Sequence, residues 1–290
     1  EVVSSITKEY PLYFPQNGWS EQNPEDWYSQ TIAALKELLS KIDTNSILSF
    51  SFSGQMHGLV MLDEKDNVIR PAILWNDSRS QHETDVLNEN KDFLLDCTSN
   101  IAFAGFTLPK LLWVKENEPE NYKRISKIML PKDYVAYRLS GNFCTDVSDA
   151  SGTLYFDVKN RKWSTEILEK YEINEKWLPK VLESDECAGT LKKEVAEELC
   201  VKDVKIIKGA GDNAAAAIGT GTVKDGDCNI SLGTSGTIFT VSDKHNLDRE
   251  SAIHSFCSAS RNYHQMACML SAAVCCNWWV EKILNDDYSS

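Results

Sequence analysis

Apolar residues recur at helical spacing soon after the chain begins. Asn23-Pro24 followed by Glu25-Asp26 is typical of a helix start, with a capping side chain, proline at the first position and acids in the first turn. An apolar stripe then predicts one amphipathic helix with a buried face. The residues of this stripe are Trp27, Ile32, Leu35, Leu38, Leu39 and Ile42.

The next segments change to a strand pattern and then return to helices. Residues 46–53 alternate apolar residues with serine, which predicts a strand. Residues 59–62 and 68–75, separated by a polar turn, predict a hairpin. Three further segments have apolar faces at helical spacing, and we expect helices at 109–116, 131–139 and 165–171.

The last third of the chain is rich in short apolar runs and glycine. In order, the pattern predicts a strand at 204–207, a turn at 209–213, a helix at 214–218, a strand at 228–232, a turn at 233–236 and a strand at 237–241. Residues 219–226 are typical of a linker, so we expect one domain over residues 1–223 and the start of another over 224–290. The segment 270–284 is apolar almost all round, and such a helix needs cover on several sides.

Composition and charge narrow the classes of partner. The 290 residues are 42% hydrophobic and 25% charged, as in ordinary globular proteins. A formal net charge of −13 provides no long-range attraction to nucleic acid or to anionic lipid. No apolar run reaches membrane-spanning length and no secretory leader opens the chain, so we expect a cytoplasmic protein without nucleic-acid or membrane partners.

The cysteines and histidines show no metal-binding spacing. Nine cysteines form no C-x-x-C pair, and most follow or precede apolar residues, so we expect buried, reduced thiols. Cys275-Cys276 lies in a helical stretch and is expected in the core. The five histidines never form an H-x-x-x-H pair, so the sequence predicts no set of metal-ligating side chains.

Three turns place small and polar residues at strand ends, where open α/β sheets bind ligands. The first covers residues 53–58, with glycines that allow close approach of a small molecule. Gln55 and His57 offer hydrogen bonds there, and Met56 offers an adaptable apolar wall. The alternative is a tight turn with a structural histidine.

The second turn, residues 208–214, carries a carboxylate where a strand meets a helix. Unpaired amides and the helix dipole favour the ionised form of Asp212, which could accept the proton of an attacking hydroxyl. One alternative is a helix cap. Another is a nicotinamide-dependent oxidoreductase, because Gly209-x-Gly211-x-x-Ala214 imitates a dinucleotide fingerprint, although Asp212 would repel the pyrophosphate.

The third turn, residues 231–236, is rich in glycine and hydroxyl groups. Backbone N–H groups and the hydroxyls of Thr234 and Ser235 could bind a phosphate without net charge. The alternative is a simple hairpin. The chain contains neither G-x-x-x-x-G-K-[ST] nor G-x-S-x-G, so we expect neither a P-loop nor a nucleophile elbow.

Seven motifs in a constant order resemble the FGGY carbohydrate kinases, and in particular those members that phosphorylate D-xylulose. The motifs are SGQMHG at 53–58, RPAILWND at 70–77, GFTLPKLLW at 105–113, LPKDY at 130–134, the segment 145–153, GAGDNAA at 209–215 and SLGTSG at 231–236. The resemblance covers essentially the whole chain.

The resemblance implies a fold and a reaction. The fold would be α/β, the ribonuclease-H-like architecture of actin, sugar kinases and heat-shock ATPases, with two domains around a central cleft. Residues 1–223 would form an N-terminal sugar-binding and catalytic domain, and residues 224–290 the start of a nucleotide-binding domain. The reaction would transfer the γ-phosphoryl group of ATP, with Mg²⁺, to the terminal hydroxyl of D-xylulose.

The resemblance also assigns roles to individual residues. Asp212 matches the catalytic base. The implied sugar contacts are Gln55, Met56, His57 and Asn213. The implied phosphate-binding turn is Gly233, Thr234, Ser235 and Gly236. A related ketopentose as substrate, a noncatalytic sugar-binding module and a homodimer stay open.

Two parts of the family pattern are absent. The family begins with a strand and a D-x-G-T turn, and its second domain runs far beyond residue 290. We therefore expect a fragment that does not turn over ATP alone. We also expect residues 270–284 to expose apolar surface that the rest of the protein would cover.

Overall fold

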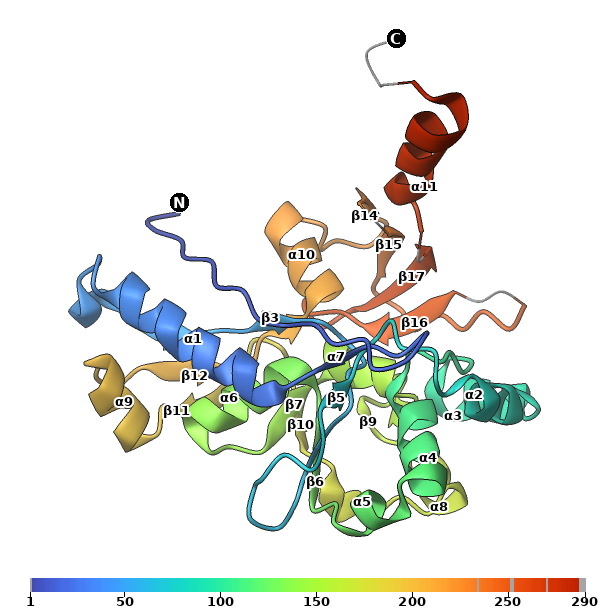
Figure 1. Cartoon of the computed structure of the whole chain (residues 1–290), viewed down its shortest axis with the longest axis horizontal. Coiled ribbons are helices and arrows are strands. Elements are labelled where there is room, and N and C mark those ends of the chain that lie inside the picture. Colours follow the sequence, from blue (N-terminus) through green and yellow to red (C-terminus); the bar gives the residue numbers. More distant parts are fainter. Residues whose placement is uncertain (1, 234, 251–252, 270, 287–290) are drawn as a thin grey trace.

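The computed structural model describes residues 2–233, 235–250, 253–269 and 271–286. Short strands lie among helices in one body, and the last helical segment projects away from it (Figure 1). The strands are β1 (Glu21–Gln22), β2 (Ser49–Phe50), β3 (Ser53–Gly54), β4 (Val60–Leu62), β5 (Ala72–Ile73), β6 (Lys127–Met129), β7 (Cys144–Asp146), β8 (Phe156–Asp157), β9 (Lys162–Trp163), β10 (Lys180–Leu182), β11 (Cys187–Thr190), β12 (Lys205–Ile207), β13 (Ala210–Gly211), β14 (Cys228–Leu232), β15 (Gly236–Ser242), β16 (His254–Cys257) and β17 (Tyr263–Met269).

Most of the described helices lie within the first 220 residues. The α-helices are α1 (Pro24–Leu39), α2 (Gln81–Asn88), α3 (Lys91–Thr98), α4 (Thr107–Asn117), α5 (Pro119–Lys123), α6 (Pro131–Ser140), α7 (Val147–Ala150), α8 (Thr165–Lys170), α9 (Lys193–Leu199), α10 (Asp212–Thr220) and α11 (Ala273–Trp278). Short 3₁₀ and π turns are η1 (Thr44–Ser46), η2 (Ser151–Thr153), η3 (Glu175–Trp177) and η4 (Trp279–Leu284). None of the helices described is long and apolar enough to cross a membrane.

The helix α1 begins as the sequence predicts. The Asn23 side chain accepts a hydrogen bond from the amide of Glu25, and Pro24 occupies the first helical position. The buried face includes Trp27, Ile32 and Leu39. The three helices predicted further along the chain are also confirmed, as α4, α6 and α8.

Two parallel strand pairs bring distant turns to the same place. β12 pairs with β2, and β13 pairs with β3 in the register Ala210 opposite Ser53 and Gly211 opposite Gly54. The predicted single strand over residues 46–53 is divided in two, and its partner is interrupted at the same point, between β12 and β13, where Gly209 has a φ of 74°. The carboxyl ends of β3 and β13 therefore meet at one edge.

The predicted hairpin and the predicted C-terminal strands are present. Leu59 bridges to Ile73 and Leu62 to Val68, although the main partner of β4 is β6. The strand predicted at 228–232 is β14, and β15 contains the strand predicted at 237–241. β14, β15, β17 and β16 form an antiparallel sheet in that order.

One hydrophobic core cluster joins this sheet to the rest of the body. Phe239 and Phe256 from the sheet belong to the same buried cluster as Met56, Phe106 and Leu108. A second cluster packs α1 against α6, α9 and the parallel strands. The first cluster places the C-terminal sheet against the turn that follows β3.

The expected burial of the cysteines is wrong for most of them, whereas the expected apolar surface near the end of the chain is present. All nine cysteines are unpaired, as predicted, but most are exposed, including Cys275 and Cys276. For Cys275 and Cys276 the reason is that α11 projects from the body, so little of the described chain covers it (Figure 1). For the same reason Trp278 and Trp279 are 55% and 53% exposed, which agrees with the expected apolar surface at 270–284.

Candidate active site

A cavity of about 170 Å³ brings together most of the predicted site residues. It lies where the ends of β3 and β13 meet the C-terminal sheet. The predicted residues that line it are Met56, His57, Asp212, Asn213 and Ser235. The other lining residues are Trp75, Ser231, Thr237, His254, Met266 and Cys268. The cavity thus combines parts of all three predicted turns.

Among the described residues, Asp212 is the only carboxylate that lines this cavity, and it opens α10. One carboxylate oxygen accepts hydrogen bonds from the backbone N–H of Asn213 at 2.8 Å and from its side-chain amide at 3.2 Å. The side chain is exposed at the cavity surface, yet the surrounding protein displaces enough water to raise the pKa of Asp212. The amides act in the predicted direction, but desolvation outweighs them. A raised pKa makes the carboxylate a better proton acceptor.

The backbone before Asp212 is held by a buried hydrogen-bond chain. The Gly211 N–H donates to Ser148 Oγ at 3.1 Å. Ser148 Oγ in turn donates to Asp146 Oδ2 at 2.5 Å, and Ser184 Oγ donates to the same oxygen at 2.7 Å. This chain ties the start of α10 to α7, so the position of Asp212 depends on buried polar groups far away in sequence.

Beneath this chain lies a fully buried cluster of three carboxylates and two lysines. Lys132 Nζ lies 2.7 Å from a carboxylate oxygen of Asp133 and of Asp146. It also lies 3.1 Å from Asp149, and Lys208 Nζ lies 2.5 Å from Asp133. Buried charges of this kind are stable only when they are paired.

The pKa shifts in the cluster indicate how its charges balance. Burial acts to lower the pKa of Lys132, but the three carboxylates raise it well above its usual range. Burial acts to raise the pKa of Asp133, but Lys132 and Lys208 lower it. Burial raises the pKa of Asp149 well above its usual range. Lys132 and Lys208 therefore favour the ionised form of Asp133, while burial disfavours the ionised form of Asp149.

His57 lines the cavity as a neutral ring of defined tautomer. Its Nδ1 lies 2.8 Å from the carbonyl oxygen of Gly152, and because a carbonyl only accepts, Nδ1 carries the proton. The ring stacks on Phe106 with 4.7 Å between centroids. Burial lowers the pKa of His57 to about 3. The ring therefore keeps Nε2 as an acceptor at neutral pH.

Met56 closes the cavity on the side of the strand pair. It is 4% exposed, and a Cβ at position 211 would lie 2.8 Å from Met56 Cγ, so this contact requires Gly211. Gln55 points elsewhere: its amide donates to Gln22 Oε1 at 2.8 Å, and it lines a separate hollow of about 190 Å³. Gln55 is the predicted sugar contact that the structure does not bring to the cavity.

The predicted phosphate-binding turn joins β14 to β15. The Gly233 N–H donates to the carbonyl of Ser235 at 2.9 Å, and the Gly233 carbonyl accepts from the N–H of Ala273 at 2.9 Å. Ser235 lines the cavity, and Gly236 packs against Ala272. Thr234 lies outside the described residues.

The sequence did not identify several of the residues that line the cavity as site residues. Trp75 and Ser231 stood in quoted motifs, but neither was named as a site residue. His254 and Met266 have no sequence signal in common, because only the antiparallel register of β16 and β17 places them opposite each other. Thr237 and Cys268 are paired in the same way across β15 and β17.

The dinucleotide alternative finds no space at its glycines. A Cβ on Gly209 would lie 1.9 Å from the carbonyl oxygen of Phe52, so that glycine permits strand packing. The missing Cβ of Gly211 faces the Met56 side chain. Both glycines thus serve contacts within the protein, which leaves no open surface for a pyrophosphate at these two positions.

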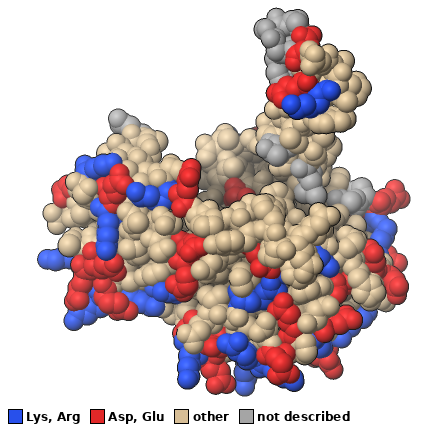
Figure 2. All heavy atoms as spheres, viewed as in Figure 1, with Lys and Arg blue, Asp and Glu red and all other residues tan. Residues whose placement is uncertain are grey.

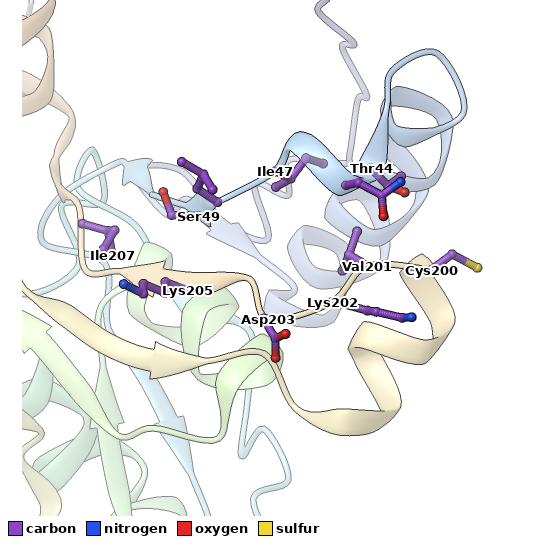
Figure 3. Close-up of a pocket in the computed structure, with 11 residues that line it drawn as sticks. Thr44, Ile47, Ser49, Cys200, Val201, Lys202, Asp203, Lys205 and Ile207 are labelled. Carbon is purple, nitrogen blue, oxygen red and sulfur yellow. The ribbon is translucent and has the colours of Figure 1, made fainter.

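Larger hollows lie away from the predicted site residues. One of about 530 Å³ is formed by the segment before β2, the segment after α9 and β12 (Figure 3). Figure 3 shows Thr44 and Ile47 on one side of it, with Val201 and Lys205 on another. Another, of about 910 Å³, lies beside Arg70. The predicted site residues line neither hollow.

The described residues that line the cavity include no lysine or arginine. On the face in Figure 2, basic and acidic side chains of the described residues are interspersed. Across the described part of the chain, no group of three or more His, Cys, Asp or Glu side chains is placed to hold a metal ion. Any anion at the cavity would therefore meet hydroxyls and backbone amides instead of a basic patch.

Comparisons with known proteins agree on one family. The model of the N-terminal domain of the FGGY family of carbohydrate kinases matches residues 1–219. Xylulose kinase of Escherichia coli is 42% identical over 279 residues, which cover 96% of this chain and 58% of the relative. Xylulose kinase of Bacillus subtilis is 40% identical over 284 residues, which cover 96% of this chain and 57% of the relative. The chain thus spans somewhat less than three fifths of the relatives' length.

Solved structures show the same fold. A xyloylose kinase from Brucella ovis superimposes with a TM-score of 0.92 at 42% identity, over 96% of this chain and 58% of that one. A ligand-bound xylulose kinase from Lactobacillus acidophilus gives 0.92 at 26% identity, over 98% and 59%. The expected ribonuclease-H-like α/β fold of the sugar kinases is confirmed. This chain belongs to the FGGY family of carbohydrate kinases.

Proposed function

We propose that the full-length protein transfers the γ-phosphoryl group of ATP to the terminal hydroxyl of D-xylulose, giving D-xylulose 5-phosphate and ADP. The observation that carries this proposal is the cavity that unites Asp212 with Met56, His57, Asn213 and Ser235. Relatives about 40% identical to this chain are named xylulose kinase, which supports the choice of sugar.

In the proposed reaction, Asp212 orients the sugar hydroxyl and accepts its proton as the oxygen attacks phosphorus. Its raised pKa suits this role, because a base works best when its pKa lies near the working pH. His57 Nε2 accepts a hydrogen bond from another sugar hydroxyl, and Asn213 offers both an acceptor and two donors. Met56 forms the apolar wall against which the carbon chain rests. Phosphoryl transfer needs little more than such positioning and charge stabilisation.

The phosphates of ATP would lie on the C-terminal side of the cavity. Ser231, Ser235 and Thr237 line that side with hydroxyl donors. We propose Gly233, Thr234, Ser235 and Gly236 as the phosphate-binding turn. Residues 1–223 would then contain the sugar-binding residues and the base, and residues 224–290 would begin the nucleotide-binding domain.

The donor set fits a magnesium ion that arrives with its nucleotide. Mg²⁺ is commonly held largely by the substrate phosphates and water, and three hydroxyls of the cavity would hold those phosphates while Asp212 stays free to act as the base. When bound, the ion would neutralise negative charge on the phosphates. The unpaired cysteines fit a reducing compartment, so we propose a cytoplasmic location.

The test uses the full-length gene product with ATP and a panel of ketopentoses, deoxy-ketoses and polyols. We expect the highest kcat/KM for D-xylulose, with the phosphate on the terminal oxygen by ³¹P and ¹³C NMR. A higher kcat/KM for another ketopentose would replace the substrate and keep the reaction. Failure to phosphorylate any sugar on the panel would contradict the proposal.

A further inference from the structure

Lys110 is a fully buried amine that the proposed reaction does not use. It lies on α4 with 0% of its surface exposed. Its Nζ donates to the carbonyl oxygen of His57 at 3.0 Å and to that of Gly105 at 2.6 Å. Thr107 Oγ1, one turn earlier on the same helix, donates to the same His57 oxygen at 3.1 Å. A buried lysine paired with main-chain carbonyls needs an explanation, because burying an amine is costly.

The acceptor of these bonds lies in an unusual turn. The Gly58 N–H donates to the Met56 carbonyl at 2.8 Å, two residues back, and His57 between them has a φ of 68°. This is the rare γ-turn with positive φ, which is strained for a residue with a side chain. Such a conformation persists only where surrounding contacts hold it.

The second carbonyl oxygen that accepts from Lys110, that of Gly105, lies behind a residue that lines the cavity. Gly105 approaches the main chain of Trp75 so closely that a Cβ would lie 2.5 Å from the Trp75 carbonyl oxygen. Trp75 and His57 both line the cavity. Lys110 therefore joins the His57 turn to a segment, distant in sequence, that packs against Trp75.

We propose that Lys110, together with Thr107, is a positioning residue that holds His57 in its strained turn and so determines the affinity for the sugar. The inference rests on the proposed function in that His57 is taken as a sugar contact. Lys110 itself does not line the cavity. It acts through the His57 main chain, so binding of ATP does not depend on it.

The protonation of Lys110 is compatible with this role on either side of neutrality. Burial lowers its pKa to about 7, while Asp77 acts to raise the pKa and Arg79 to lower it. The charged amine has three N–H donors and the neutral amine has two. Two donors are enough for the carbonyls of His57 and Gly105, so the contact survives deprotonation.

The test compares Lys110→Met with Thr107→Val and with Lys115→Met in the full-length gene product. Lys115 lies on the same helix at its exposed end, where it pairs with Glu172, and it serves as the matched control. We expect Lys110→Met to raise the KM for the sugar about tenfold, by loss of a charge-assisted bond, and Thr107→Val about threefold. The KM for ATP stays within twofold in both. Lys115→Met changes neither constant.

A second readout separates this inference from the proposed function. The ring resonances of His57, assigned with a His57→Gln variant, report its position without any substrate. We expect them to shift in Lys110→Met and Thr107→Val but not in Lys115→Met, even if no sugar is phosphorylated. Unchanged resonances and an unchanged sugar KM would overturn the inference. If Lys110→Met does not fold, Thr107→Val, which deletes one hydroxyl, decides the matter by the same two criteria.

Discussion

The two turns that face each other across the cavity are built in different ways. The turn at His57 is held by Lys110, Thr107 and Gly152 and by the Phe106 ring, all from other elements. The turn at Gly233–Gly236 is held mainly by hydrogen bonds within its own hairpin and by one bond from the N–H of Ala273. The first is imposed by tertiary packing, whereas the second is a local structure.

The residues around the first turn are buried, whereas those around the second are largely exposed. Met56 and the ring of Phe106 are buried, and the charged cluster behind β13 is fully buried as well. In β14, by contrast, Ile230 and Leu232 are 62% and 75% exposed. Changes near the first turn should therefore affect folding and sugar binding together. Changes at the second should affect only what binds there.

The largest effect is expected at Asp212, which lies between the two turns. Asp212→Asn keeps the size and hydrogen bonds of the side chain but removes the proton acceptor. We expect kcat of the full-length protein to fall about 10³-fold, as for loss of a general base, with sugar affinity within a few-fold. Steady-state kinetics and calorimetric sugar binding measure the two. A variant with near-native kcat would remove Asp212 from this role.

Acid should unfold the protein through three buried histidine rings, one in the first turn and two in the C-terminal sheet. Burial lowers the pKa of His57 to about 3, of His254 to about 4 and of His264 to about 3. The unfolded chain, with histidine pKa values near ~6.5, binds more protons than the folded one between pH 6.5 and these values. The free energy of unfolding is therefore complete above pH 6.5 and falls as the pH drops.

The size of this effect can be assigned to a single ring. Each such histidine contributes a slope of about 1.4 kcal/mol per pH unit in that window. We expect His264→Phe, which keeps an aromatic ring against Phe239, to reduce the slope by this amount in urea unfolding at pH 4.5–6.5. His82→Gln, at an exposed position, is the control and leaves the slope unchanged. Equal slopes for the native protein and His264→Phe would contradict the prediction.

A smaller loss of stability is expected when the hydrogen-bond chain behind Asp212 is broken. Ser148→Ala leaves the Gly211 N–H and one Asp146 oxygen without this partner in a buried site. We expect a destabilisation of about 1–3 kcal/mol, the usual cost of an unsatisfied buried group. Ser40→Ala, which removes an exposed hydroxyl, is the matched control. Chemical denaturation of both variants measures the difference, and equal midpoints would show that the chain adds nothing to stability.

The smallest effect belongs to the second turn. Ser235→Ala removes one hydroxyl from the phosphate side of the cavity. We expect the KM for ATP to rise about threefold to tenfold, equivalent to one hydrogen bond, with stability unchanged. Ser242→Ala, at the far end of β15, is the control. A fall in stability as large as that of Ser148→Ala would erase the contrast between the two turns.

Parts of the fold and of the site could be predicted because their sequence signals are local. The Asn23 cap, the strand at 228–232 and the polar residues at 212–213 follow from neighbouring residues alone. The placement of Gln55 could not be predicted. Its amide donates a hydrogen bond to Gln22, 33 positions earlier, and nothing near Gln55 in the sequence indicates that partner.

The sequence by itself determined several of the helices and strands, the negative charge and the motifs of the three turns, because these depend on periodicity and composition. Only the tertiary structure decided how the turns meet. His57 is positioned by Gly152, 95 positions away, and by Lys110, 53 positions away. Desolvation likewise decided the direction of the Asp212 pKa shift against its local amides. Both effects depend on which surfaces exclude water from each other, and packing sets that over distances that no local pattern spans.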